Sequence, residues 1–167
     1  MLYVLLLLAT VISDQWLKYW IINHLELGES MPFIPHILQL ERLHNYGAAF
    51  SSLTGKTAFL LGMTVVLLLV LAVLLARRVV RHPLGVIACV LILGGGIGNM
   101  IDRIGRGFVV DFIDVTCIDF YVFNIADSFV CVGCGLMILW LILDEAAQRK
   151  AKLSAAETTS EESTHEK

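Results

Sequence analysis

Charged residues are scarce in this chain, where Asp, Glu, Lys and Arg make up only 16% of 167 residues and apolar residues make up 57%. A soluble domain carries about 25% charged residues, so the composition argues against that class. The formal net charge of −3 leaves no basic excess for nucleic acid, and we expect no nucleic-acid partner. The composition therefore indicates a membrane protein, whose spanning helices largely exclude charge.

Basic residues are absent from the start of the chain, because no Lys or Arg precedes Lys18. A cleavable secretory signal peptide begins with a basic segment and ends at a cleavage site of small residues. We therefore interpret residues 2–22 as a permanent span, with a signal peptide as the alternative.

Long apolar runs are present instead. Residues 57–76, 84–101 and 123–143 approach or exceed the roughly 20 residues that cross the hydrocarbon core, and residues 2–22 are apolar apart from four positions. The sequence predicts an all-α membrane protein with four transmembrane helices in one domain, residues 1–150. The tail, residues 151–167, has almost nothing to bury and is expected to be disordered in the cytoplasm.

Basic residues in short loops indicate the orientation, because such residues stay in the cytoplasm. They cluster between the second and third spans and after the fourth span, at Arg77, Arg78, Arg81, Arg149, Lys150 and Lys152. Both termini are therefore expected in the cytoplasm, and the loops 24–56 and 102–122 on the outer face. The stretch ILQLERL in the first of these loops alternates in polarity, which is typical of a strand. A small extracytoplasmic β-rich or amphipathic subdomain is expected there.

Cysteines and histidines follow no metal-ligand spacing. Cys131 and Cys134 form a CxxC pair beside Gly133 and Gly135 inside an apolar run, which favours helix packing over redox or metal chemistry. No histidine lies near them in sequence to complete a zinc site. We expect no metal and no organic cofactor.

Two pairs of polar residues lie in or beside the spans at helical spacing. Asp14 and Lys18 are four residues apart, so they share a helix face and are expected to form an ion pair. A structural pair near the interface is the simpler interpretation, and direct catalysis is the alternative. Asn99 and Arg103 are also four apart and present an amide and a guanidinium together. Ligand contact and a structural role are both open for them.

Two further carboxyl groups, those of Asp111 and Asp127, flank the short outer segment VTCIDFYVFNIA, residues 115–126. Asp111 lies in the apolar stretch GFVVDFIDV, where we expect its pKa to be raised. Asp127 follows Asn124 by three residues, which predicts a capping box at the start of a helix, and the helix dipole favours a negative charge there. Because the segment turns back to the bundle, we expect the two carboxyl groups to meet. Two such groups share one proton, which suits acid–base hydrolysis of a peptide bond without a covalent intermediate.

Five motifs in order carry a resemblance to a known family: SDQWLKYW, ERLHNYGAAFS, GGGIGNMIDRI, GFVVDFIDV and FNIADSF. With these motifs and four spans, the chain resembles the bacterial lipoprotein signal peptidases (signal peptidase II), which are membrane aspartic proteases of the inner membrane. The resemblance implies cleavage of prolipoprotein signal peptides on the N-terminal side of the diacylglyceryl-modified cysteine. It also implies that Asp111 and Asp127 form the catalytic dyad. The expected partners are the lipid-modified prolipoprotein and membrane lipids, and the protein is expected to be a monomer.

The resemblance also extends to six polar residues that would shape the site or hold the substrate backbone. They are Asp14, Lys18, Asn45, Asn99, Arg103 and Asn124. Asn45 and the following GAAF would lie in a flap that touches substrate. The alternative function is a small transporter or channel that uses intramembrane charges, but such a protein would place its charges nearer the bilayer midplane.

Overall fold

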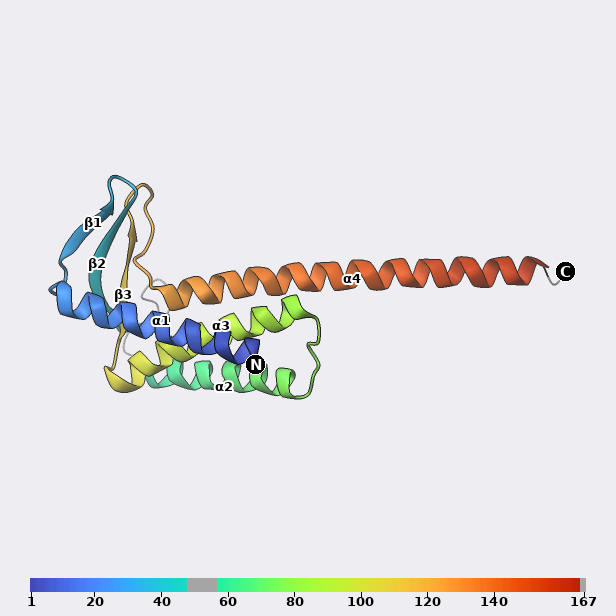
Figure 1. Ribbon diagram of the computed structural model, residues 1–167, viewed down its shortest axis with the longest axis horizontal. Helices are drawn as coiled ribbons and strands as arrows, with labels where there is room; N and C mark the ends of the chain where they lie inside the picture. The colour runs from blue at the N-terminus through green and yellow to red at the C-terminus, as the bar shows by residue number, and fades with distance from the viewer. Residues whose placement is uncertain (48–56, 166–167) are drawn as a thin grey trace.

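The computed structural model describes residues 1–47 and 57–165, and helices make up most of that part. The helices are α1 (Leu2–His24), α2 (Thr57–Ala76), α3 (Pro83–Gly105) and α4 (Ile125–His165). Each contains a stretch long and apolar enough to cross a membrane. Figure 1 shows them as a bundle that carries a small sheet at one end. The predicted all-α membrane fold with four transmembrane helices is confirmed.

Helix α3 lies at the centre of the bundle and contacts the other three helices. Its glycines allow this close approach, because a Cβ on Gly95 would overlap the backbone carbonyl of Ala126 in α4. A Cβ on Gly98 would likewise overlap the carboxylate of Asp14 in α1. In a bilayer, helices gain no hydrophobic free energy by associating, so packing of small residues brings them together.

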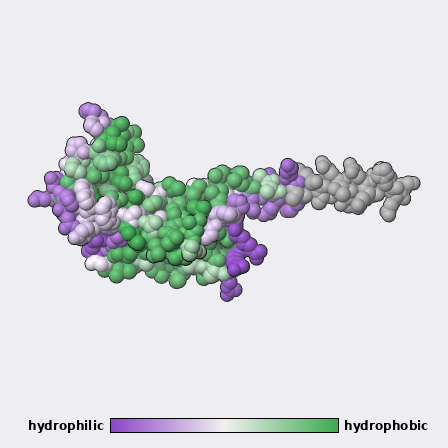
Figure 2. Space-filling view, in the orientation of Figure 1, coloured by the Kyte–Doolittle hydropathy of each residue, from purple (hydrophilic) through white to green (hydrophobic). Residues whose placement is uncertain are grey.

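Helix α1 turns polar side chains inward and apolar ones outward. Its buried residues are Thr10, Asp14, Lys18 and Ile21, which follow one face of the helix. Trp16 and Tyr19, on the other face, are exposed. Figure 2 shows the same arrangement for the bundle as a whole, whose surface is largely apolar between two polar ends. This is the pattern of a bundle that meets lipid on its outside.

The sheet is antiparallel, with three strands in the order β1 (Ser30–Ile34), β2 (Leu38–Asn45) and β3 (Val109–Val115). The expected β-rich subdomain is thus present, and the strand predicted from ILQLERL is β2. Val110 and Phe112 of β3 pack with Ile21 and Leu25 at the end of α1, which fixes β3 on the bundle. In the register of β2 and β3, Asn45 pairs with Val109 and Leu43 with Asp111, so the end of β2 lies beside Asp111.

Helix α4 continues without a break through residues 151–165, the segment expected to be disordered. Figure 1 shows this helix extending well beyond the bundle. Extending an existing helix needs no new nucleation, and the Ala, Lys, Leu and Glu residues of the segment favour helix. The domain boundary at residue 150 and the disorder of the tail stay predictions. Residues 48–56, which include most of the expected flap motif GAAF, lie outside the described residues.

Candidate active site

A pocket of about 560 Å³ lies at the end of the bundle that carries the sheet. Its polar lining comes from four elements and consists of Asn45, Asn99, Arg103, Asp111, Asp127 and Ser128. Its apolar wall comes from residues 120–123 and from Val130 and Val132 on the second turn of α4. The pocket therefore joins a small polar centre to a larger apolar surface.

Asp111 enters the pocket from β3 and is only 4% exposed. Its Oδ1 accepts a hydrogen bond from Asn124 Nδ2 at 2.7 Å, and its Oδ2 accepts one from Asn45 Nδ2 at 2.9 Å. Burial, together with the negative charge of Asp127, raises the pKa of Asp111 to about 6, against the effect of the two amide donors. The raised pKa expected from the apolar stretch is confirmed in direction, and Asp111 binds its proton more tightly than an ordinary aspartate.

Asp127 enters the pocket from the first turn of α4. The backbone N–H of Asp127 donates to Asn124 Oδ1 at 3.0 Å, and the backbone N–H of Asn124 donates back to Asp127 Oδ2 at 3.2 Å. This is the predicted capping box, and it is confirmed. The other oxygen, Asp127 Oδ1, accepts from Asn99 Nδ2 at 2.7 Å. The carboxyl group is thus held by α3 as well as by its own helix.

The two aspartates share one pocket, as the sequence predicts, and amide side chains connect them. Asn124 Nδ2 donates to Asp111 and also to Asn99 Oδ1 at 3.2 Å, while Asn99 Nδ2 donates to Asp127. Each hydrogen bond from these amides to a carboxyl group of the aspartates is donated by the amide nitrogen. The arrangement places a carboxyl group with a raised pKa beside one at a helix N-terminus.

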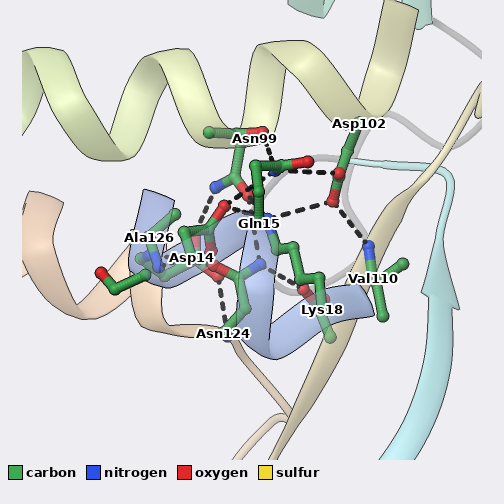
Figure 3. Close-up of polar contacts among 12 residues, drawn as sticks. Asp14, Gln15, Lys18, Asn99, Asp102, Val110, Asn124 and Ala126 are labelled. Carbon is green, nitrogen blue, oxygen red and sulfur yellow. Dashed lines mark hydrogen bonds and ion pairs between the residues drawn. The ribbon is translucent and has the colours of Figure 1, made fainter. Parts of the chain in front are cut away.

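Asp14 and Lys18 form the expected ion pair, at 2.9 Å, and both are fully buried. Lys18 also contacts Asp102 Oδ2 at 3.0 Å and donates to Asn99 Oδ1 at 2.9 Å. Figure 3 shows this group of side chains, with α1 contributing Asp14, Gln15 and Lys18. The pair lies behind the pocket wall rather than in it, which agrees with the structural interpretation of the sequence.

Asn99, Arg103 and Asn45 all line the pocket, so contact with a ligand is open to each of them. Arg103 also donates to the backbone carbonyl of Gly47 at 3.0 Å, which ties α3 to the start of the loop after β2. Asn45 Oδ1 accepts from the N–H of Gly47 at 2.8 Å and stabilises the turn there. These residues therefore have structural contacts as well as access to the pocket.

Three residues of the buried polar group were missed as site residues: Gln15, Asp102 and Arg106. Asp102 is fully buried, and it contacts Lys18, Gln15, Arg106 and the N–H of Val110. The i, i+4 spacing of Asp102 and Arg106 was a usable signal. The aromatic wall at residues 120–123 was missed as well. Its aromatic residues were the only signal in the sequence for this part of the pocket.

The CxxC pair does not serve helix packing as expected, because Cys131 and Cys134 are exposed. Only Gly133 makes the close contact, since a Cβ there would lie 2.7 Å from Ile92 in α3, whereas Gly135 faces open space. Within the described ranges, no three His, Cys, Asp or Glu residues are grouped in a way that would hold a metal ion.

The fold and the pocket together define a class of protein: a four-helix membrane protein with an acidic pocket at one end of the bundle. The family model for signal peptidase (SPase) II matches residues 6–143. A lipoprotein signal peptidase of Halalkalibacterium halodurans is 38% identical over 91% of this chain and 99% of its own length. One of Streptococcus pyogenes is 40% identical over 86% of this chain and 95% of its own length. The chain belongs to the signal peptidase II family.

Solved structures agree with this assignment. A bacterial membrane enzyme determined by the in meso method is 36% identical, covers 87% of this chain and 90% of its own, and has a TM-score of 0.83. A second structure of a bacterial membrane enzyme by that method is 37% identical with a TM-score of 0.77, over 83% of this chain and 91% of its own. None of these comparisons supports the alternative of a transporter or channel.

Proposed function

We propose that this chain is an aspartic endopeptidase that removes signal peptides from prolipoproteins. It cleaves on the N-terminal side of the diacylglyceryl-modified cysteine, with Asp111 and Asp127 as the catalytic dyad. Membership of the signal peptidase II family supports the substrate class. The observation that carries the catalytic type is that Asp111 and Asp127 line one pocket, linked by Asn99 and Asn124.

The surroundings of the two aspartates support a division of roles. Asp127 lies at a helix N-terminus and accepts hydrogen bonds from Asn99 and from the N–H of Asn124, which suits the member that takes a proton from water. Asp111, whose pKa is raised to about 6, is the member that donates a proton, and it holds that proton below about pH 6. Two neighbouring carboxyl groups resist ionising together, which keeps one proton on the pair.

Hydrolysis then needs only water and the shared proton. Asp127 takes a proton from a water molecule while the oxygen of that water attacks the scissile carbonyl carbon. At the same time Asp111 gives its proton to the carbonyl oxygen. The tetrahedral intermediate collapses when Asp127 passes its proton to the departing amide nitrogen and the hydroxyl proton returns to Asp111. The C–N bond breaks, an acid and an amine are released, and the dyad regains its starting state.

The apolar wall of the pocket suits a substrate that arrives in the bilayer. Residues 120–123, Val130 and Val132 all line the pocket. A signal peptide and a diacylglyceryl group are both soluble in lipid, so they enter between the helices without a water-filled cleft. Burial of their apolar surface contributes roughly 25 cal/mol per Å².

The proposed location is the bacterial cytoplasmic membrane, with both termini in the cytoplasm and the pocket at the outer face. Arg77 and Arg78 follow α2 at the end of the bundle away from the sheet, which is the cytoplasmic end by the rule for basic loops (Figure 1). The aspartates lie at the sheet end, where water for hydrolysis is available. The protein acts as a monomer on lipid-modified prolipoproteins, in contact with membrane lipids.

The experiment is cleavage of a lipidated prolipoprotein peptide by purified Asp111→Asn and Asp127→Asn variants in detergent. Asn keeps the shape of the side chain but cannot exchange a proton, so we expect kcat to fall by about 10³-fold or more in each. Asp114→Asn is the matched control, because Asp114 lies on the same strand but bonds to Gln39 outside the pocket. Full turnover by either dyad variant, with a thermal unfolding transition like that of the wild type, would contradict the aspartic mechanism.

A further inference from the structure

Four charged side chains form a neutral group behind the pocket: Asp14, Lys18, Asp102 and Arg106. Lys18 lies between the two carboxylates, at 2.9 Å from Asp14 and 3.0 Å from Asp102, and all three are fully buried. Arg106 pairs with the second oxygen of Asp102. Burying charges costs several kcal/mol each, and an apolar replacement of similar volume is often as stable. Adhesion between helices is therefore a weak explanation for this group.

Each buried carboxylate also holds a backbone N–H of an active-site element. Asp14 Oδ1 accepts from the N–H of Ala126 at 3.2 Å, and Ala126 directly precedes Asp127. Asp102 Oδ2 accepts from the N–H of Val110 at 3.2 Å, and Val110 directly precedes Asp111. Figure 3 shows Ala126 and Val110 on opposite sides of Lys18. The two halves of the dyad are thus each anchored, one residue upstream, to a carboxylate that Lys18 binds.

A third connection runs from Lys18 into the pocket. Its Nζ donates to Asn99 Oδ1 at 2.9 Å, so the other end of that amide, Nδ2, is turned to Asp127. An ammonium group has three N–H donors, and Lys18 has three partners: Asp14, Asp102 and Asn99. Its geometry is therefore fully specified, and Gln15 adds bonds to both carboxylates from the side.

We propose that Lys18 is a positioning residue, which sets the separation and orientation of Asp111 and Asp127 through Asp14, Asp102 and Asn99. This inference rests on the proposed dyad mechanism. Lys18 touches neither substrate nor water in the reaction, because it lies behind the pocket wall. Its effect follows from geometry, since a displacement of about 1 Å in a catalytic group costs about 10²-fold in rate.

The test uses a variant that removes the bridge but keeps the charge balanced. Lys18→Met with Asp102→Asn leaves Asp14 and Arg106 as opposite charges, and the new amide keeps an oxygen for the N–H of Val110. We expect kcat for a lipidated prolipoprotein peptide to fall about 10²-fold while KM stays within about threefold. Asp14→Asn keeps an acceptor for Ala126 but weakens the bridge, so we expect a loss of about tenfold in kcat at constant KM.

Thr10→Val is the matched control, because Thr10 is a buried polar residue on the same helix whose hydroxyl donates to the Leu7 carbonyl within that helix. It should alter thermal stability without changing kcat. If Lys18 only held the helices together, all three variants would change in thermal stability and keep the wild-type kcat. Wild-type kcat in folded Lys18→Met/Asp102→Asn protein would therefore overturn the proposal, as would a rise in KM alone.

Two results separate this proposal from the proposed function. If the double variant yields no folded protein, Asp14→Asn decides, because unchanged kcat in that variant overturns the positioning role. If the bridge variants stay active while Asp111→Asn and Asp127→Asn are inactive, the dyad stands and only the positioning role fails. Activity in the two dyad variants themselves would remove the proposed mechanism instead.

Discussion

The two ends of the bundle are held together by different interactions. The apolar end, formed by Leu68 and Leu71 of α2 with Cys89, Ile92 and Leu93 of α3, is held by packing of apolar side chains. The polar end, formed by Asp14, Lys18, Asn99, Asp102 and Asn124, is held by ion pairs and side-chain hydrogen bonds. Packing tolerates small shifts, whereas hydrogen bonds fix direction and distance. Catalytic geometry therefore belongs to the polar end, and membrane anchoring to the apolar end.

The largest effect is expected from Asn124→Ala at the polar end. Asn124 donates to Asp111 and to Asn99 and caps α4, so its loss disturbs both members of the dyad. We expect kcat to fall about 10²–10³-fold, similar to the loss of one preorganised donor in other active sites. The free energy of unfolding should fall by only about 1 kcal/mol, as for an N-cap.

Steady-state cleavage and thermal unfolding measure these two effects for Asn124→Ala. Asn23→Ala is the control, because Asn23 is likewise an asparagine at a helix end, where it donates to the Tyr19 carbonyl, but it lies outside the pocket. A stability loss large enough to explain the loss of rate would mean that Asn124 is structural only.

An intermediate effect is expected where an added methyl group enters the polar end. In Gly98→Ala the new Cβ would overlap the Asp14 carboxylate and touch Ala126, so we expect destabilisation of about 1–3 kcal/mol and a lower kcat. Gly62→Ala on α2 is the matched change away from the polar end. A Cβ there meets nothing within 4 Å, so its stability should be unchanged or slightly higher. Equal unfolding temperatures for the two variants would contradict the contrast between the regions.

The smallest effect is a shift in pH dependence from Asn45→Ala. Asn45 donates to Asp111, which lowers the pKa of that carboxyl against burial and Asp127. Because the reaction needs protonated Asp111, kcat/KM in the wild type should fall as pH rises through about 6. Removing the donor raises the pKa of Asp111 and moves this alkaline limb upward. Gln39→Ala, which removes a comparable bond to Asp114, should leave the limb in place; a downward shift in Asn45→Ala would contradict the assignment.

The sequence predicted well the structure that depends on residues close together in the chain. The spans followed from apolar length, the capping box from the spacing of Asn124 and Asp127, and the ion pair from the spacing of Asp14 and Lys18. Each of these depends on residues within one or two helical turns. The strand β2 likewise followed from its own alternation.

Most contacts between elements were beyond the reach of such patterns, and the shared pocket of Asp111 and Asp127 was the exception. Nothing in the spacing of Asp102 shows that α1 brings Lys18 to it, or that β3 brings the N–H of Val110. For the tail, polar composition suggests disorder, whereas continuity with α4 favours helix. The glycines of α3 gave the one hint of contact between helices, since they mark where α1 and α4 approach.

The proposed mechanism depends on a raised pKa at Asp111, to which the negative charge of Asp127 contributes. Infrared difference spectra across pH, with Asp111→Asn as the reference, isolate the protonated carboxyl of Asp111 in the wild type and in Asp127→Asn. We expect a midpoint near pH 6 in the wild type, and a lower midpoint in Asp127→Asn because a neighbouring negative charge is lost. A midpoint near the ordinary value of about 3.9, or one that Asp127→Asn leaves unchanged, would contradict it.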